Sequence, residues 1–223
     1  MRIGIDQLGF EYPRQSFRLH IPELSVASGE RVAFVGPSGS GKTTLLRLLA
    51  GIYLPSTGHL TLDDTAIPEL DDADRRQFRI TRIGFVFQDF HLIDYLDVEE
   101  NIRLPYRIHP ALKWTSDVAR RSEALAEATG IADKRRRRVD ELSHGEQQRV
   151  AICRALLPEP GLVLADEPTG NLDPANKERV LEILFRETRQ HGATLIMVTH
   201  DHDLLSGFPQ VIDFQNFQTP LPE

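Results

Sequence analysis

A glycine-rich segment that ends in lysine and threonine is the clearest sign of chemistry in the sequence. Residues 36–43 read GPSGSGKT and match the pattern G-x-x-x-x-G-K-[ST] at every position. The glycines let successive backbone N–H groups face one anion, and a helix that begins there adds its positive dipole end. Lys42 is expected to reach the β- and γ-phosphates of a nucleotide, and the Thr43 hydroxyl to bind Mg²⁺. The expected nucleotide-binding residues of this segment are Gly36, Ser38, Gly39, Ser40, Gly41, Lys42, Thr43 and Thr44.

Two carboxylates follow a second apolar run. Asp166 and Glu167 come directly after residues 162–165, and a strand parallel to the one before the glycine-rich segment would bring both acids to the edge where α/β sheets bind ligands. Asp166 is placed to hold Mg²⁺ through a water molecule, and Glu167 to polarise the water that attacks the phosphate. Two solvated acids at a strand end are the alternative, and the neighbouring phosphate site makes that alternative the weaker one.

Two further polar residues end apolar runs in the same way. His200 follows residues 194–199 and is expected to contact the γ-phosphate, although a single histidine is more often structural or solvated. Gln88 follows residues 83–87 and offers a neutral oxygen to Mg²⁺ or to the attacking water. The predicted catalytic residues are therefore Glu167, His200 and Gln88, and the predicted metal ligands are Thr43, Gln88 and Asp166.

The elements that must position these side chains alternate between strand and helix. Residues 1–35 favour β-structure, and the phosphate segment is expected to open a helix over residues 43–50. Residues 52–88 return to strand and turn signals. The apolar runs before Asp166 and His200 enclose an expected helix at 175–191, which makes a βαβ unit and implies parallel pairing. Further helices are expected at 98–102, 117–129 and 146–157.

These elements predict one α/β domain over residues 1–223, with a mixed β core and a helical subdomain at approximately 89–157. A chain of 223 residues with 40% hydrophobic content can bury a core without disulfides. Its only cysteine, Cys153, cannot form an intramolecular disulfide, which fits a reducing compartment, and inert packing is its expected role. No apolar run approaches the roughly 18 residues that cross a bilayer, and we expect no secretory signal. The formal net charge of −7 argues against broad nucleic-acid binding.

The order of these motifs, with LSHGEQQR at 142–149 between them, resembles that of the ATP-binding cassette (ABC) ATPases over residues 1–215. The segment 142–146 matches the family signature L-S-G-G-Q with two departures, His144 in place of the first glycine and Glu146 in place of the glutamine. Ser143 and Gly145, which contact the γ-phosphate in the family, are retained. A hydroxyl, a close N–H group and the start of a helix together suit an anion.

Other residues take family roles through this resemblance. Tyr12 lies where the family stacks an aromatic ring on adenine, with Phe10 as the alternative. Gln88 matches the Q-loop and His200 the switch histidine. The segment 165–173, ADEPTGNLD, looks like the Walker B acids followed by the D-loop, which places Asp173 at a dimer interface.

The resemblance implies a P-loop NTPase fold of the ABC type and an ATPase that uses ATP and Mg²⁺. It is similar to the branch that serves lipoprotein release, macrolide export and cell division. We therefore expect a homodimer formed on ATP binding, which drives an integral membrane permease-type subunit with a periplasmic domain. The expected location is cytoplasmic, on the inner face of the plasma membrane through that partner. No nucleic-acid partner is expected.

Several features leave alternatives open. A soluble ABC-type ATPase that acts on DNA or ribosomes is the rival function, although such relatives usually carry a long coiled-coil insertion or a second cassette. A small-molecule kinase would not need the signature segment. The basic run 134–138 is either a solvated segment or a contact for anionic lipid or for an acidic partner. Phe90, Leu92 and Ile93 are either core residues or a face for a partner's helix.

Overall fold

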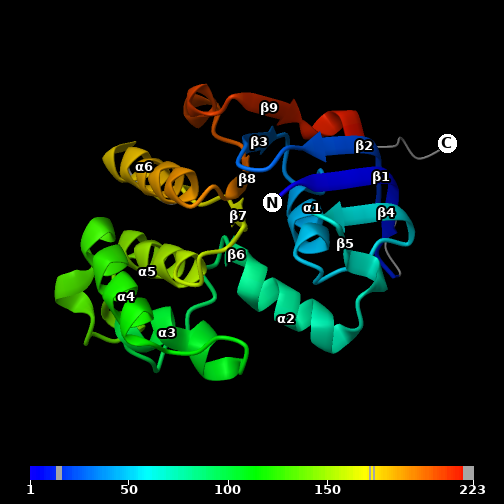
Figure 1. The fold of residues 1–223 in the computed structure, drawn as a ribbon. Helices are drawn as coiled ribbons and strands as arrows, with labels where there is room; N and C mark the ends of the chain where they lie inside the picture. The colour runs from blue at the N-terminus through cyan, green and yellow to red at the C-terminus, as the bar shows by residue number, and fades with distance from the viewer. Residues whose placement is uncertain (14–16, 171, 173, 218–223) are drawn as a thin grey trace.

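The computed structural model describes residues 1–13, 17–170, 172 and 174–217, in which strands and helices alternate (Figure 1). The strands are β1 (Ile3–Glu11), β2 (Arg18–Val26), β3 (Arg31–Val35), β4 (Thr57–Leu62), β5 (Thr65–Ala66), β6 (Ile83–Val86), β7 (Leu162–Asp166), β8 (Thr194–Thr199) and β9 (Gln210–Asp213). The α-helices are α1 (Lys42–Leu49), α2 (Asp72–Arg82), α3 (Val98–Ile108), α4 (Ser116–Thr129), α5 (His144–Leu156) and α6 (Pro174–Gln190).

The strands form two sheets with different pairing. One is antiparallel with the order β2-β1-β4-β5, and the other has the order β6-β7-β8-β3-β9 with every pair parallel. β7 and β8 lie side by side with α6 between them in the chain, as the predicted βαβ unit requires. Because the parallel strands run in one direction, the segments after β3, β6, β7 and β8 all leave the sheet at the same edge.

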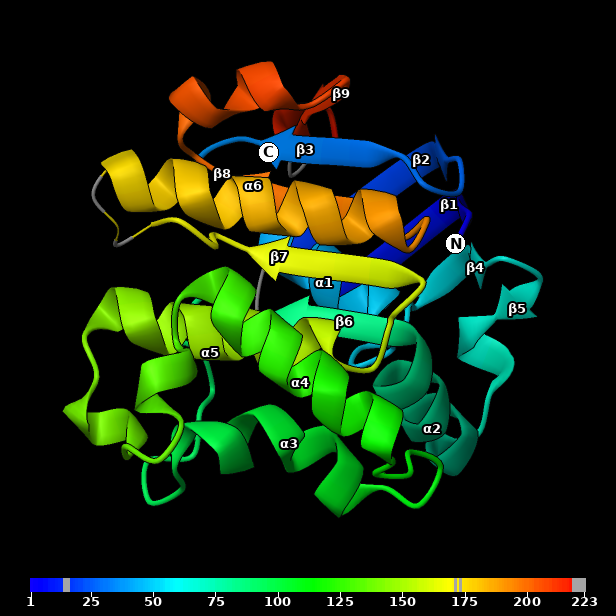
Figure 2. The same ribbon diagram turned by 60° about the vertical axis from the view of Figure 1, so that its left-hand side comes forward.

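Both faces of the parallel sheet are buried, because successive side chains of a strand point to opposite faces. Val32 and Phe34 of β3 belong to a core shared with α1 and the antiparallel sheet, whereas Ala33 belongs to a second core shared with α3, α4, α5 and α6. β7 divides in the same way, with Leu162 and Leu164 in the first core. The two sheets therefore enclose α1, and the other core holds α3, α4, α5 and α6 on the opposite face (Figure 2).

The stretch 52–88 contains a helix where strand and turn signals alone were expected. α2 spans Asp72–Arg82, and none of its residues is fully buried, so it lacks the buried apolar stripe that identifies a packed helix. Its local signals are at the ends. The Asp71 side chain accepts a hydrogen bond from the Asp74 amide at 2.8 Å, acidic residues occupy the first turn, and arginines occupy the last.

Helices α3, α4 and α5 all lie between residues 98 and 156, at the end of the molecule away from β1 and β2 (Figure 1). α3 and α5 each begin with a capping box, in which an N-cap side chain and a glutamate exchange hydrogen bonds. α5 begins at His144, two residues before its expected start, because Ser143 caps it. None of the helices in the described residues combines the length and the apolar character that spanning a bilayer requires.

Candidate nucleotide-binding site

A cavity of about 510 Å³ opens at the edge where the parallel strands end. Its residues come from the loop before α1 and from the segments that follow β1, β6, β7 and β8. They are Tyr12, Phe17, Ser38, Gly39, Gly41, Lys42, Thr43, Thr44, Gln88, Asp166, Glu167 and His200. The fold therefore brings the glycine-rich segment, both acids, Gln88 and His200 to one space.

The loop before α1 presents an uncapped helix end to this cavity. Gly41 is the N-cap of α1 with a φ of 103°, and no side chain accepts a hydrogen bond there. By contrast, α2, α3, α4 and α5 each begin with a side-chain cap. A Cβ at Gly41 would lie 2.6 Å from the Phe17 ring, so glycine is required both for its conformation and for space. Free first-turn amides and an absence of acidic residues there suit a phosphate.

Lys42 supplies a buried cation beside this helix end. It is 7% exposed, and its Nζ donates to the carbonyl oxygens of Gly36 at 2.7 Å and Pro37 at 2.9 Å. Burial lowers the pKa of Lys42, while the carboxylates of Glu167 and Asp166 act in the opposite direction. The cation is thus held inside the loop by neutral acceptors, which a phosphate group can replace at lower cost than it could replace an ion pair.

Thr43 and Asp166 lie together at the floor of the cavity. The Thr43 hydroxyl donates to Oδ1 of Asp166 at 3.1 Å, and Asp166 is 4% exposed. Burial raises the pKa of Asp166, and the hydrogen bond from Thr43 only partly opposes this. A hydroxyl and a buried carboxylate without a full cationic partner are the oxygen donors that Mg²⁺ prefers. Gln88 lines the same cavity and could add an amide oxygen. The residues present therefore fit a magnesium ion.

Glu167 and His200 face each other across the end of the sheet. Oε1 of Glu167 lies 2.9 Å from Nδ1 of His200, and the Glu167 amide donates to the Val198 carbonyl at 3.0 Å. Glu167 adopts a φ of 47°, a left-handed conformation that is unfavourable for a residue with a side chain. The Glu167 side chain is 12% exposed and that of His200 is 66% exposed. A strained, partly buried carboxylate next to an exposed imidazole is an arrangement that suits acid–base chemistry.

Aromatic residues form one wall of the cavity. Tyr12 lines it, and its hydroxyl is 2.8 Å from the Thr44 hydroxyl. Phe10 is 7% exposed and stacks on Tyr53 inside the core, so it is not available to a ligand. Phe17 lines the cavity and packs against Tyr12, with ring centroids 5.7 Å apart. Phe17 was not expected in the site, because the sequence pattern of residues 1–35 indicated only β-structure.

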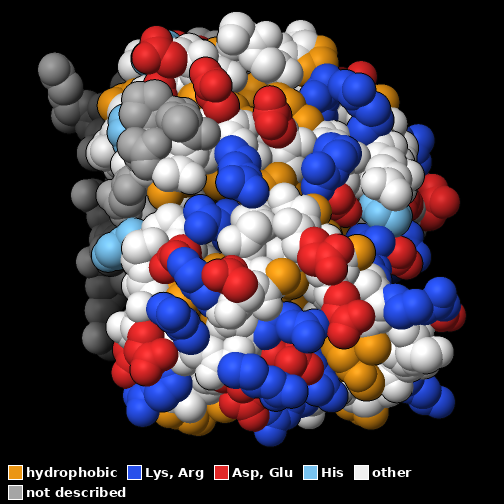
Figure 3. All heavy atoms as spheres, turned by 90° about the vertical axis from the view of Figure 1, so that its left-hand side faces the viewer, with side chains coloured by type: hydrophobic (Ala, Val, Ile, Leu, Met, Phe, Trp, Pro, Cys, Tyr) orange, Lys and Arg blue, Asp and Glu red, His pale blue; other side chains and the backbone are white. Residues whose placement is uncertain are grey.

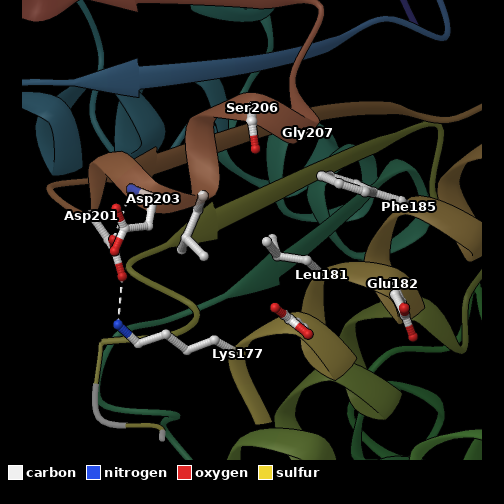
Figure 4. Close-up of a pocket in the computed structure, with 10 residues that line it drawn as sticks. Lys177, Leu181, Glu182, Phe185, Asp201, Asp203, Ser206 and Gly207 are labelled. Atoms are coloured by element: carbon white, nitrogen blue, oxygen red, sulfur yellow. Dashed lines mark hydrogen bonds and ion pairs between the residues drawn. The ribbon is translucent and has the colours of Figure 1, made fainter. Parts of the chain in front are cut away.

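A second cavity, of about 420 Å³, lies between α6 and the 3-10 segment His202–Gly207 (Figure 4). The Lys177 ammonium of α6 is 2.5 Å from Oδ2 of Asp201, and this pair crosses one end of the cavity. The hydrogen bond from Lys177 is the main reason that the pKa of Asp201 lies below its ordinary value. Because Asp201 is the neighbour of His200 in the chain, the pair anchors the segment that carries His200.

The signature residues lie apart from the cavity. Ser143 and Gly145 are not among its lining residues, and neither are Gly36 and Ser40 of the loop, whereas the other loop residues predicted to bind nucleotide line it. Ser143 caps α5, and its amide donates a hydrogen bond to Oε2 of Glu146 at 2.8 Å. Lys134 forms an ion pair with the same Glu146 carboxylate. The glutamate that departs from the family pattern is thus both a capping residue and a neutralised charge. Asp173 lies outside the described residues.

The basic run is largely compensated within the chain. Lys134, Arg135, Arg136 and Arg138 each lie within ion-pair distance of a carboxylate of Glu146, Glu123, Glu99 and Asp140, respectively. On the face formed by the helices at the left of Figure 1, Lys and Arg side chains are interspersed with Asp and Glu rather than gathered in one patch (Figure 3). This arrangement is typical of a solvated surface more than of a site for a polyanion.

A third cavity, of about 410 Å³, separates α2 and β6 from α3. Exposed Ile52 and Ile108 stand at its sides, and its lining includes Arg76, Arg79 and Arg154. Phe90 does not line this groove and is 8% exposed, so it packs in the interior rather than on a partner's surface. The groove is therefore lined by apolar side chains together with positively charged arginines.

Similarity to known proteins shows the family of the chain. The family model for ABC transporters matches residues 19–170 of the chain. The chain belongs to the ABC transporter family. It is 49% identical to an uncharacterized ABC transporter ATP-binding protein of Mycobacterium tuberculosis over 84% of this chain and 75% of that protein. It is 38% identical to the lipoprotein-releasing system ATP-binding protein LolD of Coxiella burnetii, over 87% of this chain and 83% of LolD.

Solved ABC cassettes share the fold. The dimeric structure of the bacterial ABC transporter cassette MJ0796 superposes with a TM-score of 0.85, at 30% identity, and covers 95% of this chain and 93% of that one. A second dimeric structure of MJ0796 holds ADP and Pi in a post-hydrolysis state. The P-loop NTPase fold of the ABC type is confirmed. The chain is an ABC transporter ATP-binding subunit, and its reaction is ATP hydrolysis.

Proposed function

We propose that two copies of this ABC subunit close on two ATP molecules and complete each site from opposite chains. The observation that carries this proposal is the separation of Ser143 and Gly145 from the cavity that the other site residues line. Ser143 is exposed at the start of α5, where helix amides can receive an anion from a neighbouring molecule. MJ0796, to which the chain is similar, is a dimer in its solved structure.

Charge makes this association depend on the nucleotide. Each chain carries a formal net charge of −7, so two copies repel each other unless a ligand contacts both. ATP held by Lys42 and the α1 amides, and contacted by Ser143 and Gly145 of the second chain, supplies that contact. Asp173, in the D-loop that follows the Walker B acids, is assigned to the same interface by the family resemblance.

Within one site the residues divide the work. The α1 amides, Lys42 and the loop residues hold the phosphates, and Tyr12 and Phe17 offer rings to the adenine. Thr43, Asp166 and Gln88 would hold Mg²⁺, which when bound supplies positive charge to the phosphate oxygens. Glu167 takes the proton of the attacking water. His200 holds the Glu167 carboxylate at 2.9 Å and faces the γ-phosphate.

The Glu167→Gln variant tests the division of roles and the dimer together. We expect ATP hydrolysis to fall by about 10²–10⁴-fold, the range for loss of a general base, while ATP affinity persists because Lys42 and Thr43 are untouched. Light scattering should show a dimer of this variant with Mg²⁺-ATP and a monomer without it. Near-wild-type turnover would refute the role of Glu167.

The matched control for the dimer is Ser143→Arg in the Glu167→Gln background. The added cation and bulk should prevent association, while nucleotide binding to the monomer is retained because Ser143 lies outside the cavity. A dimer that forms equally well without ATP, or that survives Ser143→Arg, contradicts sites shared between chains.

We further propose that the dimer drives an integral membrane permease-type subunit with a periplasmic domain, and that the chain is held at the cytoplasmic face of the plasma membrane by this partner. The groove between α2, β6 and α3 suits a partner helix that carries apolar side chains and a carboxylate, because Ile52 and Ile108 are exposed beside arginines. Ile108→Asp should abolish copurification with the membrane subunit. Val211→Asp, at an exposed apolar residue of β9, should not. Copurification with ribosomes or DNA ends instead would favour the rival function.

A further inference from the structure

The segment after Gln88 has an unusual backbone. Phe90 and His91 adopt φ values of 58° and 49°, so two consecutive residues with side chains occupy the left-handed region. A single residue of this kind is uncommon, and such conformations persist only where the surroundings impose them. Something outside the segment must therefore hold it, and the contacts come from α5.

Arg154, near the end of α5, holds the backbone of this segment. Its guanidinium donates to the carbonyl oxygens of both Phe90 and His91, each at 2.5 Å. Arg154 is 9% exposed, and among the described residues it forms no ion pair with a carboxylate. The guanidinium holds its donors in a rigid planar fork, whereas lysine carries one ammonium on a flexible stem and fixes two carbonyls less firmly.

His144, at the start of α5, holds a side chain of the same segment. Its ring lies edge-on to the Phe90 ring, with centroids 5.9 Å apart and an interplanar angle of 63°. His91 in turn stacks on Phe87, the last residue before Gln88, with centroids 4.5 Å apart. The segment is thus fixed to α5 at both ends of the helix and to the residue that precedes Gln88.

We propose that His144 and Arg154 are positioning residues that join the Gln88 segment and the Ser143 cap into one rigid unit. The inference rests on the proposed function, in which Gln88 serves the site of its own chain and Ser143 serves the site of the partner. A shift of Ser143 on contact with one nucleotide is then carried along α5 to Gln88 at the other. The two ATP sites of the dimer are linked through this unit, and His144 gives the signature departure a role.

Hydrogen exchange on the free chain tests the unit without any activity. In Arg154→Lys, amides of residues 85–95 should exchange about 10- to 100-fold faster, the ratio expected for loss of one hydrogen bond from a charged donor. In His144→Ala the same amides should exchange roughly 2- to 10-fold faster, and His144→Phe should restore them because it keeps an aromatic pair. Amides of α1 should not change in any of these variants.

Two controls separate this effect from general loosening. Arg121→Lys removes another arginine that donates to a carbonyl, that of Leu156 at 3.2 Å, and His59→Ala removes another exposed histidine. Neither should change exchange at 85–95. Unchanged exchange in both Arg154→Lys and His144→Ala overturns the proposal. Because His144 is exposed, the His144→Ala variant keeps the fold even if Arg154→Lys does not.

Cooperativity of ATP hydrolysis tests the link between sites. We expect a Hill coefficient above 1 for the wild-type dimer, which falls toward 1 in His144→Ala and Arg154→Lys and is restored in His144→Phe, while ATP affinity of the monomer stays constant. Faster exchange with an unchanged Hill coefficient overturns the link. A wild-type chain that does not dimerise with ATP refutes the proposed function instead, and the exchange result still decides whether α5 holds the segment.

Discussion

Replacing Asp166 with asparagine should stabilise the free chain and abolish its ATPase activity. Asp166 is 4% exposed, and the only hydrogen bond to its side chain among the described residues comes from Thr43. Desolvation is the largest cause of its raised pKa, and repulsion from Glu167 adds to it. Asparagine keeps the size of the side chain and the acceptor for Thr43 but removes the buried charge.

The size of the gain follows from two opposing effects. Burying an ion costs several kcal/mol, and the attraction of Lys42 and Arg47 already offsets much of that cost. We expect a net stabilisation of about 1–2 kcal/mol, which corresponds to a rise in Tm of roughly 2–8 °C for a chain of this length. ATP hydrolysis should fall by at least ~100-fold, because the neutral amide no longer supplies negative charge to the cation that accompanies ATP.

The pH dependence has a definite sign. Because burial raises the pKa of Asp166, the folded chain binds this proton more tightly than the unfolded chain does. The favourable contribution of the protonated carboxyl is complete below the unfolded pKa, about 3.9, and is lost as the pH rises through the folded pKa. The Tm difference between Asp166→Asn and wild type should therefore be largest at neutral pH and shrink as the pH falls toward 4.

Thermal unfolding without nucleotide, at several pH values, checks these expectations. Asp213→Asn is the matched control, because Asp213 also ends a strand of the parallel sheet but is exposed, and its Tm should stay within about 1 °C of wild type. A lower Tm for Asp166→Asn at neutral pH, or a difference from wild type that does not vary with pH, would refute the view that Asp166 is a buried and incompletely compensated charge.

Two other substitutions test the surroundings of the site. Gly41→Ala forces a Cβ against the Phe17 ring and should weaken ATP binding by at least ~10-fold. The control Gly192→Ala is strained at a φ of 62° but has open space around the new Cβ, so it should cost only about 1–2 kcal/mol of stability. Equal ATP affinities of the two variants in a titration would contradict the steric argument. Lys177→Met should lower kcat with little change in ATP affinity, because Asp201 then no longer anchors the segment of His200. Since Lys177 lowers the pKa of Asp201, the stability that the pair contributes is present above the unfolded pKa of Asp201 and is lost as the pH falls through its folded pKa. A variant with wild-type kcat would exclude the anchoring role.

Most of the site could be predicted from the sequence because its motifs are local. The glycine-rich segment and Lys42 are contiguous, and the conformation they require depends on residues within a few positions. Asp166 and His200 each follow a short apolar run, and parallel strands bring such ends to one edge. The order of apolar runs in the sequence is therefore enough to predict that Asp166 and His200 lie at the same edge of the sheet.

Other features depended on residues far apart in the chain. α2 has no buried stripe for periodicity to detect, so only its end residues mark it. Phe17 reaches the cavity because the pairing of β2 with β1 and the packing of both against α1 place its ring beside Gly41. Arg154 resembles an ordinary residue of an amphipathic helix until folding places its guanidinium against the carbonyls of Phe90 and His91.

The signature segment shows where the two kinds of information divide. The sequence by itself placed Ser143 just before a helix, and the family resemblance gave it an expected contact with phosphate, because both depend on neighbouring residues. Only the tertiary structure decided that Ser143 lies outside the cavity of its own chain and that Lys134 neutralises Glu146. The physical reason is that side-chain type and spacing set local conformation, whereas distance between remote segments is set by how the two cores pack on the parallel sheet.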